Sequence, residues 1–209
     1  MPFNYKKNAA SIYKESFATI RAEADLSAFT AEEEIIAVRM IHASGMVELA
    51  HSIKFMSNFA IEARTALEKG APILCDTKMV SEGITRARLP KSNKIICTIQ
   101  DPRVKIMAEK LGNTRSAAAI ELWRPYVKGA VIAIGNAPTA LFHLLNLLEE
   151  PNYPRPAAII GCPVGFVGAS ESKDALMSST TVPCCVTVGR LGGSAITVAA
   201  LNAIASRVE

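Results

Sequence analysis

Apolar residues recur at helical spacing in the first third of the chain. A helix is predicted over residues 9–24. Thr30 and Glu33 form a capping box, in which each side chain satisfies a free amide at a helix start, and this second helix is expected to run to about residue 52. His42 lies one position beside its apolar stripe. The pattern therefore predicts two amphipathic helices before any strand.

Further along, short apolar runs have the length and composition of buried parallel strands. These five runs cover residues 72–75, 94–99, 130–134, 157–160 and 184–188. Helical stretches precede or separate them at residues 58–69, 79–84, 103–111, 116–123, 137–148, 170–177 and 194–206. This alternation predicts an α/β fold, with a three-layer, doubly wound, mainly parallel five-stranded sheet and helices on both faces.

The composition fits one such core. Of the 209 residues, 50% are hydrophobic, 20% charged and only 6% aromatic, a balance typical of helices packed on a sheet. The proline-rich segment 150–156 is followed by another strand, so residues 1–209 are expected to form a single domain. The chain shows no signal-peptide core and no run of about 18 apolar residues. A cytoplasmic protein with no membrane contact is expected.

Charge and cysteine content narrow the possible partners. A formal net charge of +4 from dispersed basic residues argues against nucleic-acid binding and favours an anionic small ligand. The cysteines form no C-x-x-C pair and lie mostly in apolar runs, which predicts buried, reduced thiols. They are Cys75, Cys97, Cys162, Cys184 and Cys185.

Glycine-rich loops follow three of the predicted strands, at residues 135–139, 161–168 and 189–194. Ligands of open parallel sheets bind at this edge, where helix N-termini offer backbone amides. Tight turns need glycine regardless of function, however, and neither G-x-G-x-x-G nor the G-x-x-x-x-G-K-[ST] phosphate loop is present. A nucleotide-dependent oxidoreductase would also need an acidic residue after the last strand, where Gly189-Arg190 stands instead. Dinucleotide binding is weakly supported.

Arginines and one histidine supply the candidate chemistry. Arg86, Arg88 and Arg115 lie on predicted loops, where guanidinium groups suit a ligand with many carboxylates. A surface ion pair explains each of them equally well. His42 is the candidate acid, because an imidazole titrates near neutrality, although a lone histidine beside an apolar stripe is more often a packed residue.

The other histidines do not suggest a site. His51 is expected on the surface, and His143 is expected to pack among leucines. The chain contains no H-x-x-x-H, no G-x-S-x-G and no Asp/Glu cluster at metal-ligand spacing. Hydrolase and metalloenzyme functions therefore lose most of their support, and no metal or cofactor is predicted.

A series of motifs adds information that composition cannot supply. In chain order they are ASIY at 10–13, SF at 16–17, IRAEA at 20–24, RMIHA at 39–43, GITRARLP at 83–90, GNTRSAAA at 112–119, IGNAPTALF at 134–142, GCPVGFVG at 161–168 and GGSA at 192–195. The series resembles the precorrin-8X methylmutase family of corrin biosynthesis, which also has a cobalt-precorrin-8 version. The resemblance runs nearly end to end.

This resemblance implies an isomerase that moves a methyl group from C11 to C12 of precorrin-8X and yields hydrogenobyrinate, with no organic cofactor or catalytic metal. It implies that His42, in the RMIHA motif, is the proton donor near ring C. Protonation of the ring would draw electron density from the migrating position and lower the barrier to a [1,5]-shift, while a rigid pocket holds the macrocycle.

The resemblance also implies a substrate pocket and an assembly. Ser16, Thr85 and Arg115 match positions that line the pocket. Arg86, Asn136 and Gly165 are expected among the substrate-binding residues, because their loops would pack against the macrocycle or its acetate and propionate arms. A homodimer with the active site at its interface is implied, which would let a small chain enclose an anionic, tetrapyrrole-derived ligand.

Two alternatives stay open. One is the cobalt-precorrin-8 methylmutase of the anaerobic pathway, although residues 161–166 and 192–200 resemble the aerobic-pathway enzymes more closely. The other is a carrier that binds corrinoid without turnover, in which His42 would only hydrogen-bond the ligand.

Overall fold

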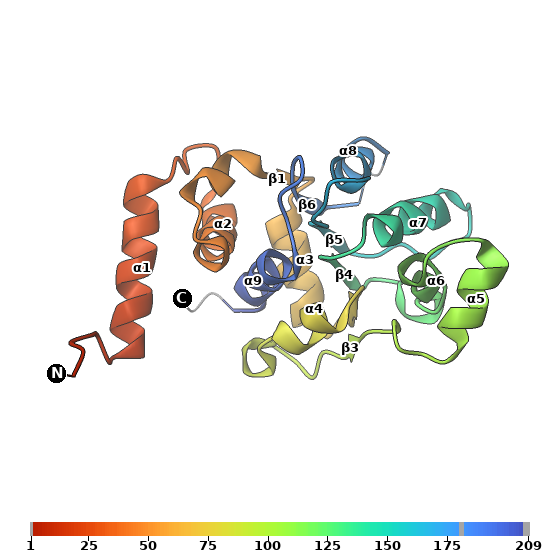
Figure 1. Ribbon diagram of the computed structural model, residues 1–209, viewed down its shortest axis with the longest axis horizontal. Coiled ribbons are helices and arrows are strands. Elements are labelled where there is room, and N and C mark those ends of the chain that lie inside the picture. Colours follow the sequence, from red (N-terminus) through yellow and green to blue (C-terminus); the bar gives the residue numbers. More distant parts are fainter. Residues whose placement is uncertain (1, 180–181, 207–209) are drawn as a thin grey trace.

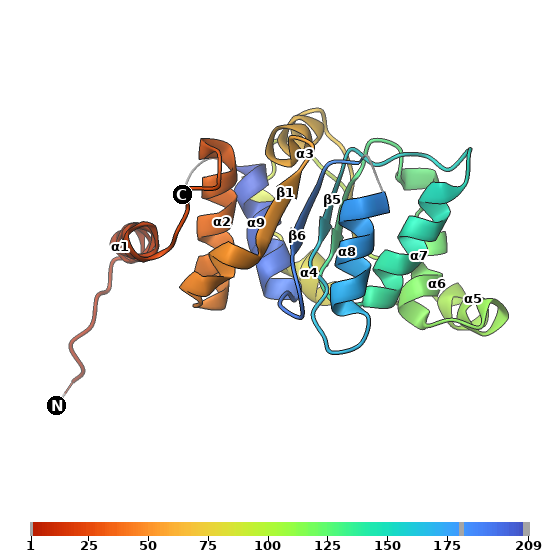
Figure 2. The same cartoon turned by 90° about the horizontal axis from the view of Figure 1, so that it is seen from above.

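Residues 2–179 and 182–206 are described by the computed structural model, in which a sheet lies between two layers of helices (Figures 1 and 2). Its strands are β1 (Ile53–Met56), β2 (Ile73–Cys75), β3 (Ile95–Ile96), β4 (Val131–Ile134), β5 (Ala158–Gly161) and β6 (Cys184–Thr187). They are ordered β1-β6-β5-β4-β2-β3, and every neighbouring pair is parallel except β1 with β6. The predicted α/β fold with a mainly parallel sheet is confirmed.

Helices cover both faces of this sheet, as predicted. They are α1 (Ala9–Glu23), α2 (Ala31–Ser44), α3 (Phe59–Glu68), α4 (Lys78–Gly83), α5 (Arg103–Leu111), α6 (Arg115–Glu121), α7 (Pro138–Glu149), α8 (Ala169–Ser179) and α9 (Ser194–Ala205). Short 3-10 helices are η1 (Val47–Ser52), η2 (Arg86–Arg88) and η3 (Arg124–Tyr126). Within the described residues, no helix is long and apolar enough to cross a membrane.

Alternate residues of β4 face opposite helical layers. Val131 and Ala133 pack with buried side chains of α2, α3 and α9, whereas Ile132 and Ile134 pack with those of α6, α7 and α8. Side chains alternate between the faces of a strand, so a strand covered on both faces is apolar at every position. This explains why the five predicted strands read as unbroken apolar runs.

The second helix is shorter than predicted. It begins at the expected capping box, in which Thr30 and Glu33 satisfy each other's amides, but it ends at Ser44 and not near residue 52. Gly45 takes φ +69° and donates its N–H to the carbonyl of Ile41. A glycine in the left-handed region is a common helix stop, and the chain continues as η1.

The sheet has six strands, so the prediction of five was incomplete. The apolar pattern predicts no element at residues 53–56, because β1 has only four residues and lies between two helical stretches. It pairs antiparallel with β6, with Ile53 opposite Thr187. Ser57 and Asn58 then take φ values of +55° and +58° and turn the chain into α3. Such a short edge strand is defined by its partner rather than by its own pattern.

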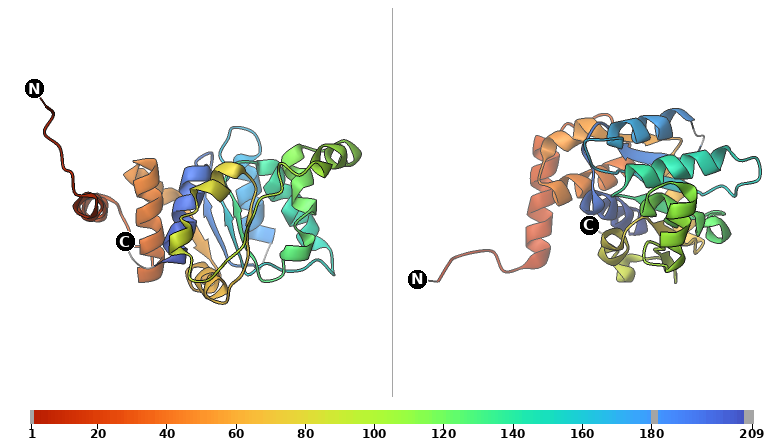
Figure 3. Two further views of the ribbon diagram at one scale, coloured as in Figure 1. Left: turned by 90° about the horizontal axis from the view of Figure 1, so that it is seen from below. Right: turned by 45° about the vertical axis from the view of Figure 1, so that its right-hand side comes forward.

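Helix α1 lies at one end of the molecule against α2, and residues 2–8 extend outward beyond it (Figures 1, 2 and 3). Asn8 caps the helix by accepting the N–H of Ser11. Phe17 and Ile20 are its two buried side chains, and most of its other residues are exposed. The helix is therefore anchored on the body of the protein by one narrow stripe.

The cysteines are free thiols, and all but one are buried. Cys75, Cys162, Cys184 and Cys185 are buried, as predicted, while Cys97 is half-buried. Burial raises the pKa of the Cys184 thiol to about 12. A thiol in such surroundings packs as a small apolar side chain.

Candidate active site

His42 lies in the last turn of α2, next to the buried Ile41 and with its own side chain exposed. Ile41 is 1% exposed, whereas His42, at the next position around the helix, is exposed. On α1, Ser16 immediately precedes the buried Phe17 and faces α2. Packing of the two helices thus brings together two residues that are 26 positions apart.

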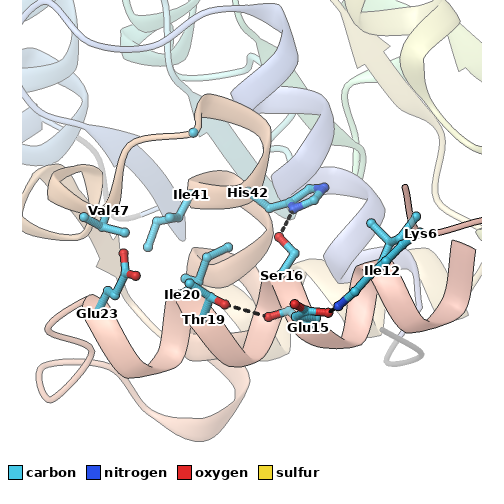
Figure 4. A pocket seen from close by; sticks show the side chains of 11 residues that line it. Lys6, Ile12, Glu15, Ser16, Thr19, Ile20, Glu23, Ile41, His42 and Val47 are labelled. Carbon is cyan, nitrogen blue, oxygen red and sulfur yellow. Dashed lines mark hydrogen bonds and ion pairs between the residues drawn. The ribbon is translucent and has the colours of Figure 1, made fainter. Parts of the chain in front are cut away.

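A hydrogen bond of 2.8 Å joins Ser16 Oγ and His42 Nδ1 (Figure 4). A hydroxyl can accept from a protonated Nδ1 and can donate to an unprotonated one, so Ser16 can remain bonded to the ring in either charge state. The other ring nitrogen, Nε2, lies on the side of the ring away from Ser16 (Figure 4). It is the nitrogen through which His42 can exchange a proton with a ligand.

Aromatic rings surround the imidazole. The Tyr13 ring is 5.4 Å from the His42 ring between centroids, and the Phe17 ring is 5.3 Å away in an edge-to-face arrangement. The Arg39 guanidinium lies 5.3 Å from the Phe17 centroid. Tyr13, Phe17 and Arg39 all lie within the motifs that resemble the family, but their positions around the His42 ring were not predicted from the sequence. The available signal was spacing, since Tyr13 and Phe17 are four residues apart and Arg39 and His42 three.

Two hollows flank α1 at this point. The first, of about 620 Å³, lies between α1 and α2 (Figure 4). Its lining comprises Lys6, Ile12, Glu15, Ser16, Thr19, Ile20, Glu23, Ile41, His42, Gly45 and Val47. Lys6 forms an ion pair with Glu15 there. With two carboxylates and one ammonium group, this hollow is mildly acidic.

The second hollow, of about 520 Å³, lies on the other side of α1 and contains no carboxylate. It is lined by Ala10, Tyr13, Lys14, Phe17, Ala18, Arg21 and Arg88. Arg21 also pairs with Glu34 of α2 at 2.7 Å. Tyr13 and Phe17, which contact the His42 ring, belong to this lining. An anionic ligand would find complementary charge here rather than in the first hollow.

The other predicted site residues lie on separate loops. Thr85 is exposed, and its N–H donates to Asn202 Oδ1 of α9 at 2.9 Å. Arg86 is exposed in η2, and Arg115 starts α6, where its guanidinium donates to the carbonyl of Ile99. Among the predicted site residues that the structure describes, Ser16 is the one that hydrogen-bonds His42.

Asn136 and Gly165 lie in loops that follow β4 and β5. The side chain of Asn136 is exposed just before α7. Gly165 takes φ +153°, and its N–H donates to the carbonyl of Arg190. Thr139 of α7 hydrogen-bonds Thr114, the residue before Arg115, at 2.8 Å. Hydrogen bonds therefore connect the loop before Arg115 with the helix that follows Asn136. Separately, they connect the glycine-rich loop 161–168 with the glycine-rich loop 189–194.

Two buried charged residues hold these loops, and neither is predicted from the sequence. Asp76, just after β2, accepts N–H groups from the residues that follow β4. Lys173 of α8 donates to the carbonyls of Pro163 and Leu191 at 3.0 and 2.6 Å. Burial lowers the pKa of the Lys173 ammonium group. The position of Asp76 at a strand end was a usable signal, but nothing distinguished Lys173 from an exposed helical lysine.

The remaining histidines lie elsewhere. His51 is exposed, as predicted. His143 is half-buried, and its Nε2 is 2.7 Å from Glu121 Oε1, so it joins α7 to α6 rather than only packing among leucines. In the part of the chain that the structure covers, no three His, Cys, Asp or Glu side chains are grouped to hold a metal ion.

Comparisons with known proteins place these observations in context. Residues 11–207 match the family described as precorrin-8X methylmutase. The chain is 57% identical to precorrin-8X methylmutase from Sinorhizobium sp over 97% of both chains, and 51% identical to that from Pseudomonas aeruginosa over 99% of both. It is 37% identical to cobalt-precorrin-8 methylmutase from Methanocaldococcus jannaschii over 86% of this chain and 81% of the relative. The crystal structure of precorrin-8x methyl mutase from Thermus thermophilus superposes with a TM-score of 0.85 at 35% identity, covering 94% of this chain and 95% of that one.

Proposed function

Because the chain belongs to the precorrin-8X methylmutase family, and is thereby an isomerase of cobalamin biosynthesis, we propose that it moves a methyl group from C11 to C12 of precorrin-8X. The product is hydrogenobyrinate. Substrate and product have the same composition, so every proton that the enzyme donates must be matched by a proton that leaves the macrocycle.

His42 is the proton donor in this proposal. The observation that carries it is the contact between Ser16 Oγ and His42 Nδ1, which turns Nε2 away from Ser16. Ser16 would accept from Nδ1 while the imidazolium is charged and would keep accepting from it once Nε2 has given up its proton, because the neutral ring then carries its hydrogen on Nδ1. Protonation of the macrocycle near ring C draws electron density from C11 and lowers the barrier to the shift. The proton released from the product then restores His42.

The acid arms of the substrate require cationic and polar partners. We expect Arg115, Arg86, Thr85, Asn136 and the loop of Gly165 to contact the macrocycle or its arms, as the family motifs imply. Two further cations, Lys14 and Arg88, line the hollow that also contains Tyr13 and Phe17. Aromatic faces suit a flat conjugated ring and guanidinium groups suit carboxylates, so this hollow supports the proposal in shape and in charge.

A homodimer completes the proposed site. Helix α1 has only one narrow buried stripe. Ile12 and Tyr13 on this helix are exposed by 43% and 48%, and Phe3 and Tyr5 in the segment before it by 93% and 67%. Exposed large apolar side chains on one element suit an interaction surface. A second copy covering α1 would enclose both hollows and exclude water from His42. The cytoplasm is the compartment we propose for this assembly.

The metal-free macrocycle is the substrate that we propose. Relatives named for precorrin-8X are 57% and 51% identical to this chain, whereas the relative from Methanocaldococcus jannaschii named for cobalt-precorrin-8 is 37% identical. Rates measured on both substrates with one enzyme preparation would test this choice. A larger kcat/KM for cobalt-precorrin-8 would reverse it.

Turnover by wild-type protein and by His42→Ala tests the proposed chemistry. Purified protein is incubated with precorrin-8X while the absorption spectrum is followed. The wild type should convert the spectrum to that of hydrogenobyrinate, whereas His42→Ala should bind the substrate and convert it at least about 100-fold more slowly, since general acid catalysis contributes about that much or more. His51→Ala is the matched control, because His51 is exposed and lines neither hollow.

Three results would contradict parts of this proposal. Normal turnover by His42→Ala would remove its acid role. Binding of precorrin-8X by wild type with no spectral conversion would favour a corrinoid carrier. Loss of turnover in His51→Ala equal to that in His42→Ala would show that the effect is not specific to the pair formed with Ser16.

A further inference from the structure

Asp76 is a buried carboxylate directly after β2, only 3% exposed. Its oxygens accept three consecutive backbone N–H groups, from Gly135 at 3.1 Å, Asn136 at 2.9 Å and Ala137 at 3.0 Å. Its own N–H donates to the carbonyl of Ala133. Burial raises the pKa of this carboxyl group, while the three N–H donors lower it. One side chain thus accepts hydrogen bonds from all three N–H groups of the turn between β4 and α7.

Consecutive N–H groups at a helix N-terminus form an anion-binding site. Helix α7 starts at Pro138, which has no N–H, and the three residues before it direct their N–H groups to Asp76. In this protein the chain's own carboxylate occupies the site. A carboxylate arm of a ligand therefore cannot use the N–H groups of residues 135–137, and the exposed side chain of Asn136 is the group that this turn offers instead.

The same loop is confined on its other sides. A Cβ atom at Gly135 would lie 2.6 Å from Thr197 Oγ1 and 3.1 Å from the Cα of Ser194, so the loop backbone packs directly on the first turn of α9. Three residues after Asn136, Thr139 is bonded to Thr114. Asn136 is therefore the exposed residue of a loop that is held by β2, α6 and α9.

We propose that Asp76 is a positioning residue for substrate binding: it fixes the backbone of residues 135–137 so that the Asn136 side-chain amide meets an acid arm of the macrocycle. This inference rests on the proposed function, and it assigns the binding of an acid arm by this loop to one amide donor, the side chain of Asn136. A preorganised donor forms its hydrogen bond without first paying the entropy of ordering its loop.

The substitution Asp76→Asn keeps the shape of the side chain but turns an NH2 group towards backbone N–H donors. It should raise KM for precorrin-8X about tenfold and change kcat by less than about twofold, because the lost interaction concerns binding rather than the reacting atoms. Asp76→Glu, which retains the carboxylate on a longer side chain, should raise KM by less. Ser81→Ala, which removes a buried hydroxyl that donates to the carbonyl of Lys78, is the control and should leave KM unchanged.

A double-mutant cycle separates positioning from general destabilisation. Asn136→Ala should raise KM, and Asp76→Asn should add nothing further in that background if it acts through Asn136. Independent effects on KM that multiply in the double variant would overturn the proposal. Equal losses of kcat and kcat/KM in Asp76→Asn would also overturn it.

Amide hydrogen exchange tests the positioning role with no substrate present. In Asp76→Asn or Asp76→Glu the amides of residues 135–137 should exchange at least about tenfold faster, while amides of α2 keep their wild-type rates. Unchanged exchange at these three amides would refute the positioning role, even if precorrin-8X is the correct substrate. Faster exchange with no turnover of precorrin-8X by wild type would instead refute the proposed function and leave the anchoring of the loop established.

Discussion

His42 lies on an exposed helix end, whereas the loops at the carboxyl edge of the sheet are held from within by buried charges. The α1–α2 pair that carries Ser16 and His42 is joined by the hydrogen bond between these two residues, by the partly exposed ion pair of Arg21 with Glu34 and by a few aromatic contacts. The sheet-edge loops, defined as residues 135–137, 162–168 and 188–193, are fixed by Asp76 and Lys173.

This difference separates two tasks of the proposed active site. Recognition of a large macrocycle benefits from loops that are ordered before the ligand arrives, and buried charge-assisted hydrogen bonds provide that order. Proton transfer needs an imidazole that can reach the ligand and change charge, which an exposed position allows. In this proposal, the α1–α2 pair is the part that a ligand or a second copy completes.

The largest expected effect is in the sheet-edge loops, from Gly192→Ala. Gly192 takes φ +152°, and a Cβ there would lie 2.3 Å from the carbonyl oxygen of Cys162. Strain and overpacking together should lower the free energy of unfolding by about 3 kcal/mol or more, measured by urea denaturation. Gly112→Ala is the control, because φ is also positive there but the space is open, and it should cost only about 1 kcal/mol. Equal losses would mean that the close approach between these loops is unimportant.

Lys173→Met should have the next largest effect. It removes the buried ammonium group that bridges Pro163 and Leu191. The carbonyl of Leu191 retains a hydrogen bond from Thr187. We therefore expect the free energy of unfolding to fall by about 2 kcal/mol, because the carbonyl of Pro163 loses its bond and Lys173 no longer bridges the two loops. The exposed Lys105→Met should change the free energy of unfolding by less than about 0.5 kcal/mol. A stability equal to wild type in Lys173→Met would show that packing alone holds these loops.

Ser16→Ala probes the α1–α2 pair and should change activity rather than stability. Loss of one hydrogen bond to a charged imidazole should lower kcat about tenfold, with the free energy of unfolding unchanged within about 0.5 kcal/mol. Ser11→Ala, on the same helix and bonded to the backbone of Asn8, should retain full kcat. A loss of stability with normal kcat would reverse the contrast between the two regions.

Ile12→Ser should have the smallest effect on folding. Ile12 is 43% exposed on α1, so the free energy of unfolding of the isolated chain should change by less than about 0.5 kcal/mol. Sedimentation should nevertheless show weaker self-association, because the substitution removes apolar area from the proposed dimer surface. Ile61→Ser, also exposed but on α3, should leave self-association unchanged. Identical association in both variants would exclude α1 from the interface.

Much of the fold was predictable from the sequence, because its signals are local. The capping box at Thr30, the apolar runs of β2, β4, β5 and β6, and the motif around His42 each depend on residues within one turn or one strand. Helical periodicity placed His42 one position beside the apolar stripe, but it favoured a packed side chain, whereas the structure shows an exposed one. The left-handed stop at Gly45 was equally local, although the predicted helix ran past it.

Tertiary structure alone decided the contacts that define the candidate site. Ser16 meets His42 across 26 residues, and Asp76 meets Asn136 across 60. Strand β1, which the pattern did not predict, forms because β6 lies beside it. Lys173 is buried because two loops close over it. Periodicity and capping are determined by neighbours along the chain, whereas burial and long-range hydrogen bonds depend on how the elements pack, which no local pattern encodes.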